Sequence, residues 1–152
     1  MFRISQLLTT LHDDMVALKP VKPARKMLGP VVIWNLIRRC NLRCKHCYST
    51  SLDIDFKDEL TTEQIKATID DLKVAQVPVL ILSGGEPLLR PDIYEITAYA
   101  KAKGFYVALS TNGTLIDESN IEKIKAADYQ YVGFSIDGLE EFHDEFRRQQ
   151  GS

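Results

Sequence analysis

Hydrophobic runs of strand length alternate along the chain with longer segments of helical periodicity. The four runs are rich in β-branched or aromatic residues: 30–37 (PVVIWNLI), 77–82 (VPVLIL), 105–110 (FYVALS) and 129–136 (YQYVGFSI). Apolar residues recur three or four positions apart in the segments that follow these runs, which are 60–75, 91–104, 118–127 and 139–150. The two spacings predict strands and amphipathic helices, respectively. The order is strand then helix, four times over, which predicts an α/β fold of parallel strands covered by helices.

Residues with strong end preferences mark the expected helix boundaries. Thr61 and Gln64 have the spacing of a capping box at the start of the first helix. Pro91 suits the first position of the second helix, and Gly104 suits its end. Asp117 is expected to cap the third helix.

Residues 1–28 do not share this alternation, because prolines interrupt any periodicity after one amphipathic stretch. We therefore expect an N-terminal extension and linker over 1–28 and a domain that begins at residue 29. Right-handed crossovers would either curve the domain into a barrel or wind it around an open sheet.

Composition narrows the class of protein. The chain has 152 residues, of which 45% are hydrophobic and 26% charged, as expected for one globular domain. Its net charge of −2 gives no reason to expect nucleic acid as a partner. No apolar stretch approaches the ~18 residues that a membrane helix needs, and no secretory signal is apparent. We expect a cytoplasmic protein that binds neither membrane nor nucleic acid.

A polar motif follows each of the four expected strands. A cysteine loop (38–50) follows the first, SGGEP (83–87) the second, STNG (110–113) the third and SIDG (135–138) the fourth. The carboxyl ends of parallel strands meet at one rim of a sheet, where such folds build their active sites. The four motifs are therefore expected to form one pocket.

The residue types in these motifs suit a ligand with several polar groups. Gly84 and Gly85 let the backbone approach a ligand, and the carboxylate of Glu86 suits an ammonium group. A plain strand-to-helix turn with a solvated glutamate is the alternative. Asn112 can equally be a turn residue, and Ser135 and Asp137 can equally be capping residues. If functional, the last two offer hydroxyl and carboxylate groups to a sugar.

All three cysteines of the chain lie in one C-x3-C-x2-C run, Cys40, Cys44 and Cys47. Structural zinc sites use four protein ligands, so a zinc site would have to recruit His12, His46 or His143. A lone reactive cysteine is a further alternative. Iron–sulfur clusters are also held by four thiolates as a rule, so three would leave one iron open to a small molecule.

The C-x3-C-x2-C run after a first strand, with GGEP after a second, resembles the radical SAM superfamily over about residues 30–148. The resemblance implies a 4Fe-4S cluster on the three cysteines and S-adenosylmethionine (SAM) on its open iron, cleaved reductively to a 5′-deoxyadenosyl radical. It implies that His46 lies beside the adenine and that the methionine amino group meets the segment 84–86. It also implies contacts to the SAM carboxylate or ribose from residues at the later strand ends, namely Ser110, Asn112, Ser135 and Asp137.

The segments 29–48, 77–92 and 104–117, and the opening MFRISQ, further resemble the NirJ family, the radical SAM proteins of haem d1 biosynthesis. This implies an iron tetrapyrrole substrate, didecarboxysirohaem, and a low-potential electron donor. Related enzymes of haem b formation or peptide modification, and a non-catalytic metal-binding fragment, are the alternatives. Because radical SAM cores have more strand–helix units than these four, we expect a partial parallel (β/α) barrel. The complete enzyme would then carry further units and a second iron–sulfur cluster, and the 152 residues alone would be inactive.

Overall fold

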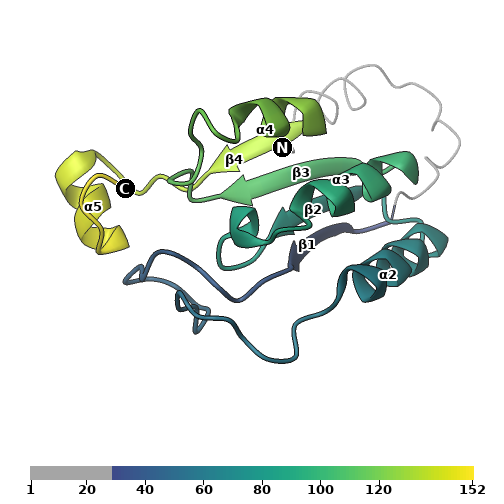
Figure 1. Ribbon diagram of the computed structural model, residues 1–152, viewed down its shortest axis with the longest axis horizontal. Coiled ribbons are helices and arrows are strands. Elements are labelled where there is room, and N and C mark those ends of the chain that lie inside the picture. Colours follow the sequence, from purple (N-terminus) through teal and green to yellow (C-terminus); the bar gives the residue numbers. More distant parts are fainter. Residues whose placement is uncertain (1–28) are drawn as a thin grey trace, which may run out of the picture.

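The computed structural model describes residues 29–152, and the extension and linker expected over 1–28 lie outside the described residues. Four parallel strands form one sheet in the order β1-β2-β3-β4 (Figure 1). Their bounds are β1 Val31–Asn35, β2 Val79–Ser83, β3 Tyr106–Thr111 and β4 Tyr131–Phe134. The predicted parallel α/β fold is confirmed. Because each strand pairs with its successor in the chain, the sheet is an arc of a barrel rather than a doubly wound sheet.

The helices between the strands line up along one face of the sheet (Figure 1). They are α2 (Thr62–Val74), α3 (Ile93–Ala102) and α4 (Ile121–Ala127), and a short 3-10 helix, η1 (Pro87–Leu89), precedes α3. The last helix, α5 (Glu140–Arg147), lies beyond the carboxyl ends of the strands instead. No helix within residues 29–152 is long and apolar enough to cross a membrane.

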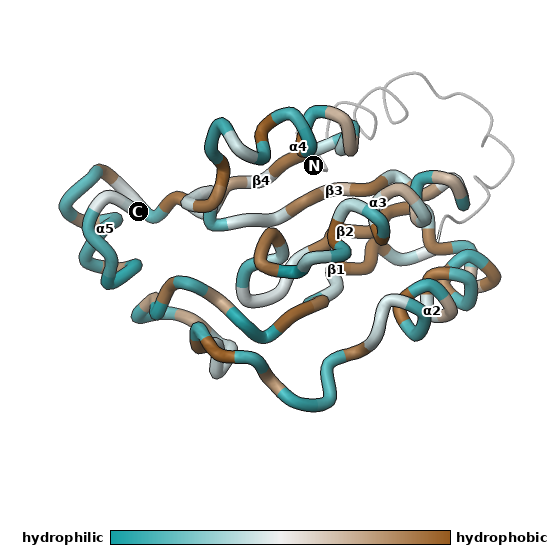
Figure 2. The backbone as a smooth tube through the Cα atoms, in the orientation of Figure 1, coloured by the Kyte–Doolittle hydropathy of each residue, from teal (hydrophilic) through white to brown (hydrophobic). Residues whose placement is uncertain are grey.

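The core lies between the sheet and its helices. Alternate residues of the central strands point toward the helices and are fully buried, among them Leu80, Leu82, Val107 and Leu109. Figure 2 shows the hydrophobic colour concentrated on these strands. The opposite face is more open, and Ile33 on β1 is 66% exposed. On β1, Val32 and Trp34 are half-buried against the core, and the residues that alternate with them are exposed.

Two of the helix-boundary predictions are confirmed. The side chain of Thr61 accepts a hydrogen bond from the backbone of Gln64, whose own side chain accepts from the backbone of Thr61. Gly104 follows the last turn of α3 with a φ of +81°, a conformation that glycine adopts without strain.

Two others are wrong by a few residues. Helix α3 begins at Ile93 rather than at Pro91, because Asp92 is held in a turn by its ion pair with Arg90. Helix α4 begins at Ile121, with Asn120 before it. Asp117 does not cap it, because its side chain accepts instead from the nearby backbone of Ser119, in a turn that competes with the helix.

Candidate functional site

The polar motifs at the strand ends meet around one cavity of about 240 Å³. Nine of the eleven candidate residues line it: Cys40, Cys44, His46, Cys47, Gly84, Gly85, Ser110, Asn112 and Ser135. The remaining two, Glu86 and Asp137, do not line the cavity but contact residues that do. Parallel strands thus bring together residues almost a hundred positions apart, as expected for this rim of the sheet.

The three thiols differ in exposure. Cys40 is buried, Cys44 is half-buried and Cys47 is exposed. The Cys40 sulfur accepts a hydrogen bond from the amide of Leu42 at 3.4 Å. Burial raises the pKa of the Cys40 thiol, and the nearby Glu86 adds to this, while the Leu42 amide opposes it. Within residues 29–152, no three histidine, cysteine or acidic residues converge closely enough to hold a single metal ion.

The glycines of SGGEP permit two loops to touch. The amide of Gly85 donates to the carbonyl of Ile37 at 2.6 Å, and the amide of Glu86 donates to Arg39 at 2.9 Å. A Cβ atom on Gly85 would lie 2.3 Å from the Arg39 carbonyl oxygen. The close approach that the sequence suggested is therefore made to the protein's own cysteine loop, and it fixes the start of that loop against the end of β2.

Glu86 is fully buried, and both of its carboxylate oxygens accept hydrogen bonds from the protein. Oε1 accepts from the Thr111 hydroxyl at 2.8 Å and from the Leu88 amide at 3.0 Å, and Oε2 accepts from the Asn112 amide at 2.8 Å. Burial raises the pKa of this carboxyl, and the three donors oppose the shift. The side chain thus joins the loop after β2 to the end of β3.

Asn112 continues this connection to the cysteine loop. Its side-chain nitrogen donates to the Asn41 side chain at 3.0 Å and lies 3.9 Å from the Cys40 sulfur. Its side-chain oxygen accepts from the amide of Thr114 at 2.9 Å. Asn112 is therefore more than a turn residue, because it links the third strand end to the first cysteine.

Helix α5 packs against the cysteine loop through Phe146 and Arg147. The guanidinium of Arg147 lies with Nη1 3.5 Å from the Cys44 sulfur and with Nε 2.7 Å from Oδ2 of Asp137. The other oxygen of Asp137 lies 3.7 Å from Nε2 of His46. The His46 ring packs against Phe146, with ring centroids 5.5 Å apart.

Sequence reasoning missed Arg147, which lines the cavity and is 7% exposed. One signal was present in the sequence. His143 and Arg147 are four residues apart, so they share a face of the helix, and both are buried. His143 accepts a hydrogen bond from the Asp137 amide at 3.1 Å, which fixes the SIDG turn onto α5.

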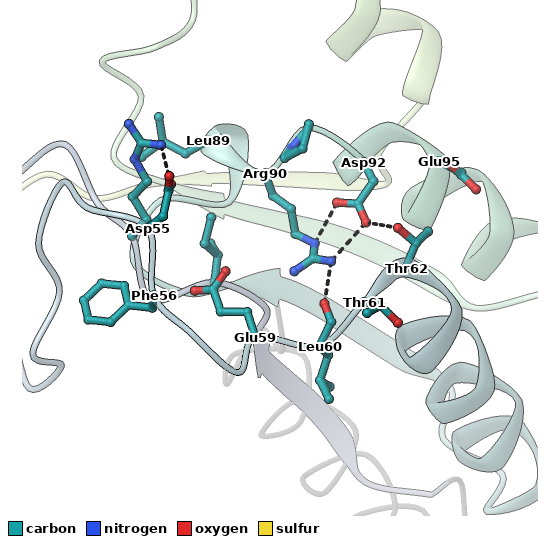
Figure 3. Close-up of a pocket in the computed structure, with 13 residues that line it drawn as sticks. Asp55, Phe56, Glu59, Leu60, Thr61, Thr62, Leu89, Arg90, Asp92 and Glu95 are labelled. Carbon is teal, nitrogen blue, oxygen red and sulfur yellow. Dashed lines mark hydrogen bonds and ion pairs between the residues drawn. The ribbon is translucent and has the colours of Figure 1, made fainter.

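A larger hollow of about 750 Å³ lies on a different part of the surface (Figure 3). Its centre is Arg90, which pairs with Asp92 and donates to the carbonyls of Leu36 and Leu60. Thr62 donates to the same Asp92 carboxylate at 2.6 Å. Arg90 therefore fastens the end of β1, the start of α2 and the start of α3 together, which supports the intervening cysteine loop.

Comparison with known proteins identifies the family of the chain. The Radical SAM superfamily profile matches residues 34–152. The chain is 51% identical over 123 residues to an Fe-coproporphyrin III synthase of Methanosarcina barkeri, covering 81% of this chain and 31% of the relative. It is 48% identical over 147 residues to a pre-heme d1 synthase of Dinoroseobacter shibae, covering 97% of this chain and 35% of the relative.

Two solved structures share the fold. Native anSMEcpe with bound AdoMet is 28% identical, with a TM-score of 0.60 over 76% of this chain and 34% of that protein. Streptococcus suis SuiB bound to its precursor peptide SuiA is 14% identical, with a TM-score of 0.67 over 95% of this chain and 39% of SuiB. The chain spans about a third of the length of the two synthases named above. On the match over residues 34–152, the chain belongs to the radical SAM superfamily.

Proposed function

We propose that the chain forms part of a radical SAM enzyme that modifies an iron tetrapyrrole, with Cys40, Cys44 and Cys47 holding a 4Fe-4S cluster. The observation that carries the proposal is that these three thiols line one cavity together with the ends of β2, β3 and β4. A domain boundary near residue 29 and a further iron–sulfur cluster elsewhere in the enzyme belong to the same proposal.

The donor set fits such a cluster. The chain has no fourth cysteine, so three thiolates would leave one iron open to the amino and carboxylate groups of SAM. When bound, the reduced cluster supplies one electron to the sulfonium of SAM and so starts radical chemistry. The protein's part is to present the thiols and to orient SAM beside them.

The other cavity residues would orient SAM. The backbone of Gly84 and Gly85 lines the cavity beside the cysteines and suits the methionine amino group, with Glu86 in the same segment. We assign the SAM carboxylate and ribose to residues that line or adjoin the cavity: Ser110, Asn112, Ser135 and Asp137. We assign the adenine to the half-exposed His46 ring, which packs against Phe146.

The substrate assignment follows the similarity to pre-heme d1 synthase, which extends over 97% of this chain. We propose removal of propionate side chains from didecarboxysirohaem, with a low-potential electron donor, in the cytoplasm and without nucleic acid or membrane. The 51% identity to an Fe-coproporphyrin III synthase supports a second candidate, a haem b pathway enzyme. Peptide modification is a third, since mycofactocin maturases are 42% identical over 115 residues.

Anaerobic reconstitution of the full-length protein with iron and sulfide tests the cluster. We expect an EPR signal of the reduced cluster that changes when SAM is added. Cys→Ala at positions 40, 44 and 47 should each abolish the cluster, whereas Ser119→Ala, outside the cavity, should retain it. A metal analysis that gives about one zinc and no sulfide would support the non-catalytic alternative instead.

Substrate choice needs a separate assay. The reconstituted protein is incubated with reductant, SAM and either didecarboxysirohaem or iron-coproporphyrin III. The masses of the products are then measured by mass spectrometry. We expect loss of propionate mass from the first compound. Formation of iron-coproporphyrin III from the first compound, or turnover of the second, would reassign the chain to the haem b candidate. An intact, SAM-cleaving protein that turns over neither compound would contradict a tetrapyrrole substrate.

A further inference from the structure

Arg147 holds a positive charge against one of the three thiols. Its Nη1 lies 3.5 Å from the Cys44 sulfur, and the residue is 7% exposed. Within residues 29–152, no other charged side chain is hydrogen-bonded to a cysteine sulfur; the remaining contacts of this kind come from the Leu42 amide and the Asn112 side chain, both to Cys40. The contact therefore singles out Cys44.

An ion pair with Asp137 holds the guanidinium in this position. Asp137 pairs with its Nε at 2.7 Å, which leaves the Nη1 end of the fork directed at Cys44. Asp137 is itself fixed, because its amide donates to His143 on the same helix as Arg147. Lys45, next to Cys44, donates its amide to the carbonyl of Phe146 at 2.8 Å, so helix and loop are joined on both sides of the contact.

An arginine beside a thiolate stabilises the negative charge of the sulfur. It keeps its charge at every physiological pH, and a charge-assisted hydrogen bond to sulfur is strongest where the negative charge is greatest. Reduction of an iron–sulfur cluster adds negative charge to the cluster and its thiolates. Hydrogen bonds to the sulfurs therefore favour the reduced state and raise the reduction potential.

We propose that Arg147 is a positioning residue that donates to the Cys44 thiolate and raises the reduction potential of the cluster, with Asp137 directing its side chain. The inference rests on the proposed function of the cysteine site. On this proposal, the reduction potential of the cluster depends on α5 as well as on the cysteine loop.

The test is an EPR-monitored redox titration of the reconstituted full-length protein without SAM. R147Q should shift the potential to more negative values, and R147K, which keeps the charge but loses the planar fork, should shift it less. R148Q is the matched control. It removes the same charge from the next residue, which is exposed, and should leave the potential unchanged.

The outcomes separate this inference from the proposed function. A wild-type protein that takes up no cluster contradicts the proposed function. A wild-type cluster with the same potential in R147Q and R148Q overturns the inference alone, and weaker SAM binding at an unchanged potential would make Arg147 a SAM contact instead. If R147Q fails to hold the cluster, R147K decides: a potential equal to that of R148Q overturns the inference.

Discussion

The backbone amide of Asn112 donates a 2.8 Å hydrogen bond to Oε2 of Glu86, which joins the end of β3 to the loop after β2. The same Asn112 reaches the Asn41 side chain in the cysteine loop. The fully buried Glu86 therefore connects the end of β2 to the end of β3 directly, and to the cysteine loop after β1 through Asn112. The buried carboxylate should therefore contribute to the stability of the protein, which can be measured as a free energy of unfolding.

Glu86→Ala should lower the free energy of unfolding by about 2–4 kcal/mol, because it leaves buried donors of Leu88, Thr111 and Asn112 without their acceptor. Urea denaturation of the full-length apoprotein measures this loss. Glu118→Ala, at an exposed position, is the control and should change stability by no more than about 0.5 kcal/mol. Equal effects of the two substitutions would contradict the role of the buried carboxylate.

The three thiols should react with iodoacetamide in the apoprotein in the order Cys47, Cys44, Cys40, which is the order of decreasing exposure. Burial raises the pKa of Cys40 above its ordinary value of 9.0, so at pH 8 its thiolate fraction is smaller than that of an exposed thiol. The Cys40 rate should still be rising with pH above pH 9. Peptide mass spectrometry over a pH series gives the three rates, and fastest reaction at Cys40 would refute the assigned burial.

The features that sequence reasoning predicted depend on local patterns. The four strands follow from short β-branched runs, and the capping box follows from Thr61 and Gln64, three residues apart. Their order then places the motifs on one rim without further information. The spacing of His143 and Arg147 indicates that they share a helix face, but it does not indicate the contact of Arg147 with Cys44, which lies 103 residues away. The direction of the Glu86 carboxylate likewise depends on Thr111, 25 residues away.

Gly85→Ala should destabilise the protein and reduce cluster content, because its Cβ would lie 2.3 Å from the Arg39 carbonyl oxygen and force the two loops apart. Overpacking of this kind costs about 1–3 kcal/mol. Glu118→Ala, at an exposed position, is the control and should change neither quantity. Iron and sulfide content per chain, with a denaturation curve, measures both effects. A Gly85→Ala protein with full iron content and unchanged stability would show that the loops need no such contact.

Asp92→Asn should lower stability at pH 7 by about 2 kcal/mol, because it removes the charge that pairs with the buried Arg90 (Figure 3). Burial would raise the pKa of Asp92, but the hydrogen bonds from Arg90 and Thr62 outweigh it and hold the pKa below its ordinary 3.8. A lowered folded-state pKa stabilises the protein fully above pH 3.8, and this stabilisation is lost as the pH falls through the lower value.

The difference in unfolding free energy between the wild type and Asp92→Asn should therefore be constant near neutral pH and shrink below about pH 4. Asp71→Asn, at an exposed position of α2, is the control and should show no such dependence. Denaturant titrations of the full-length apoprotein at several pH values measure the difference. A gap that widens toward acid would mean that the Asp92 pKa is raised on folding, and the Arg90 pair would then not stabilise the loop that carries the cysteines.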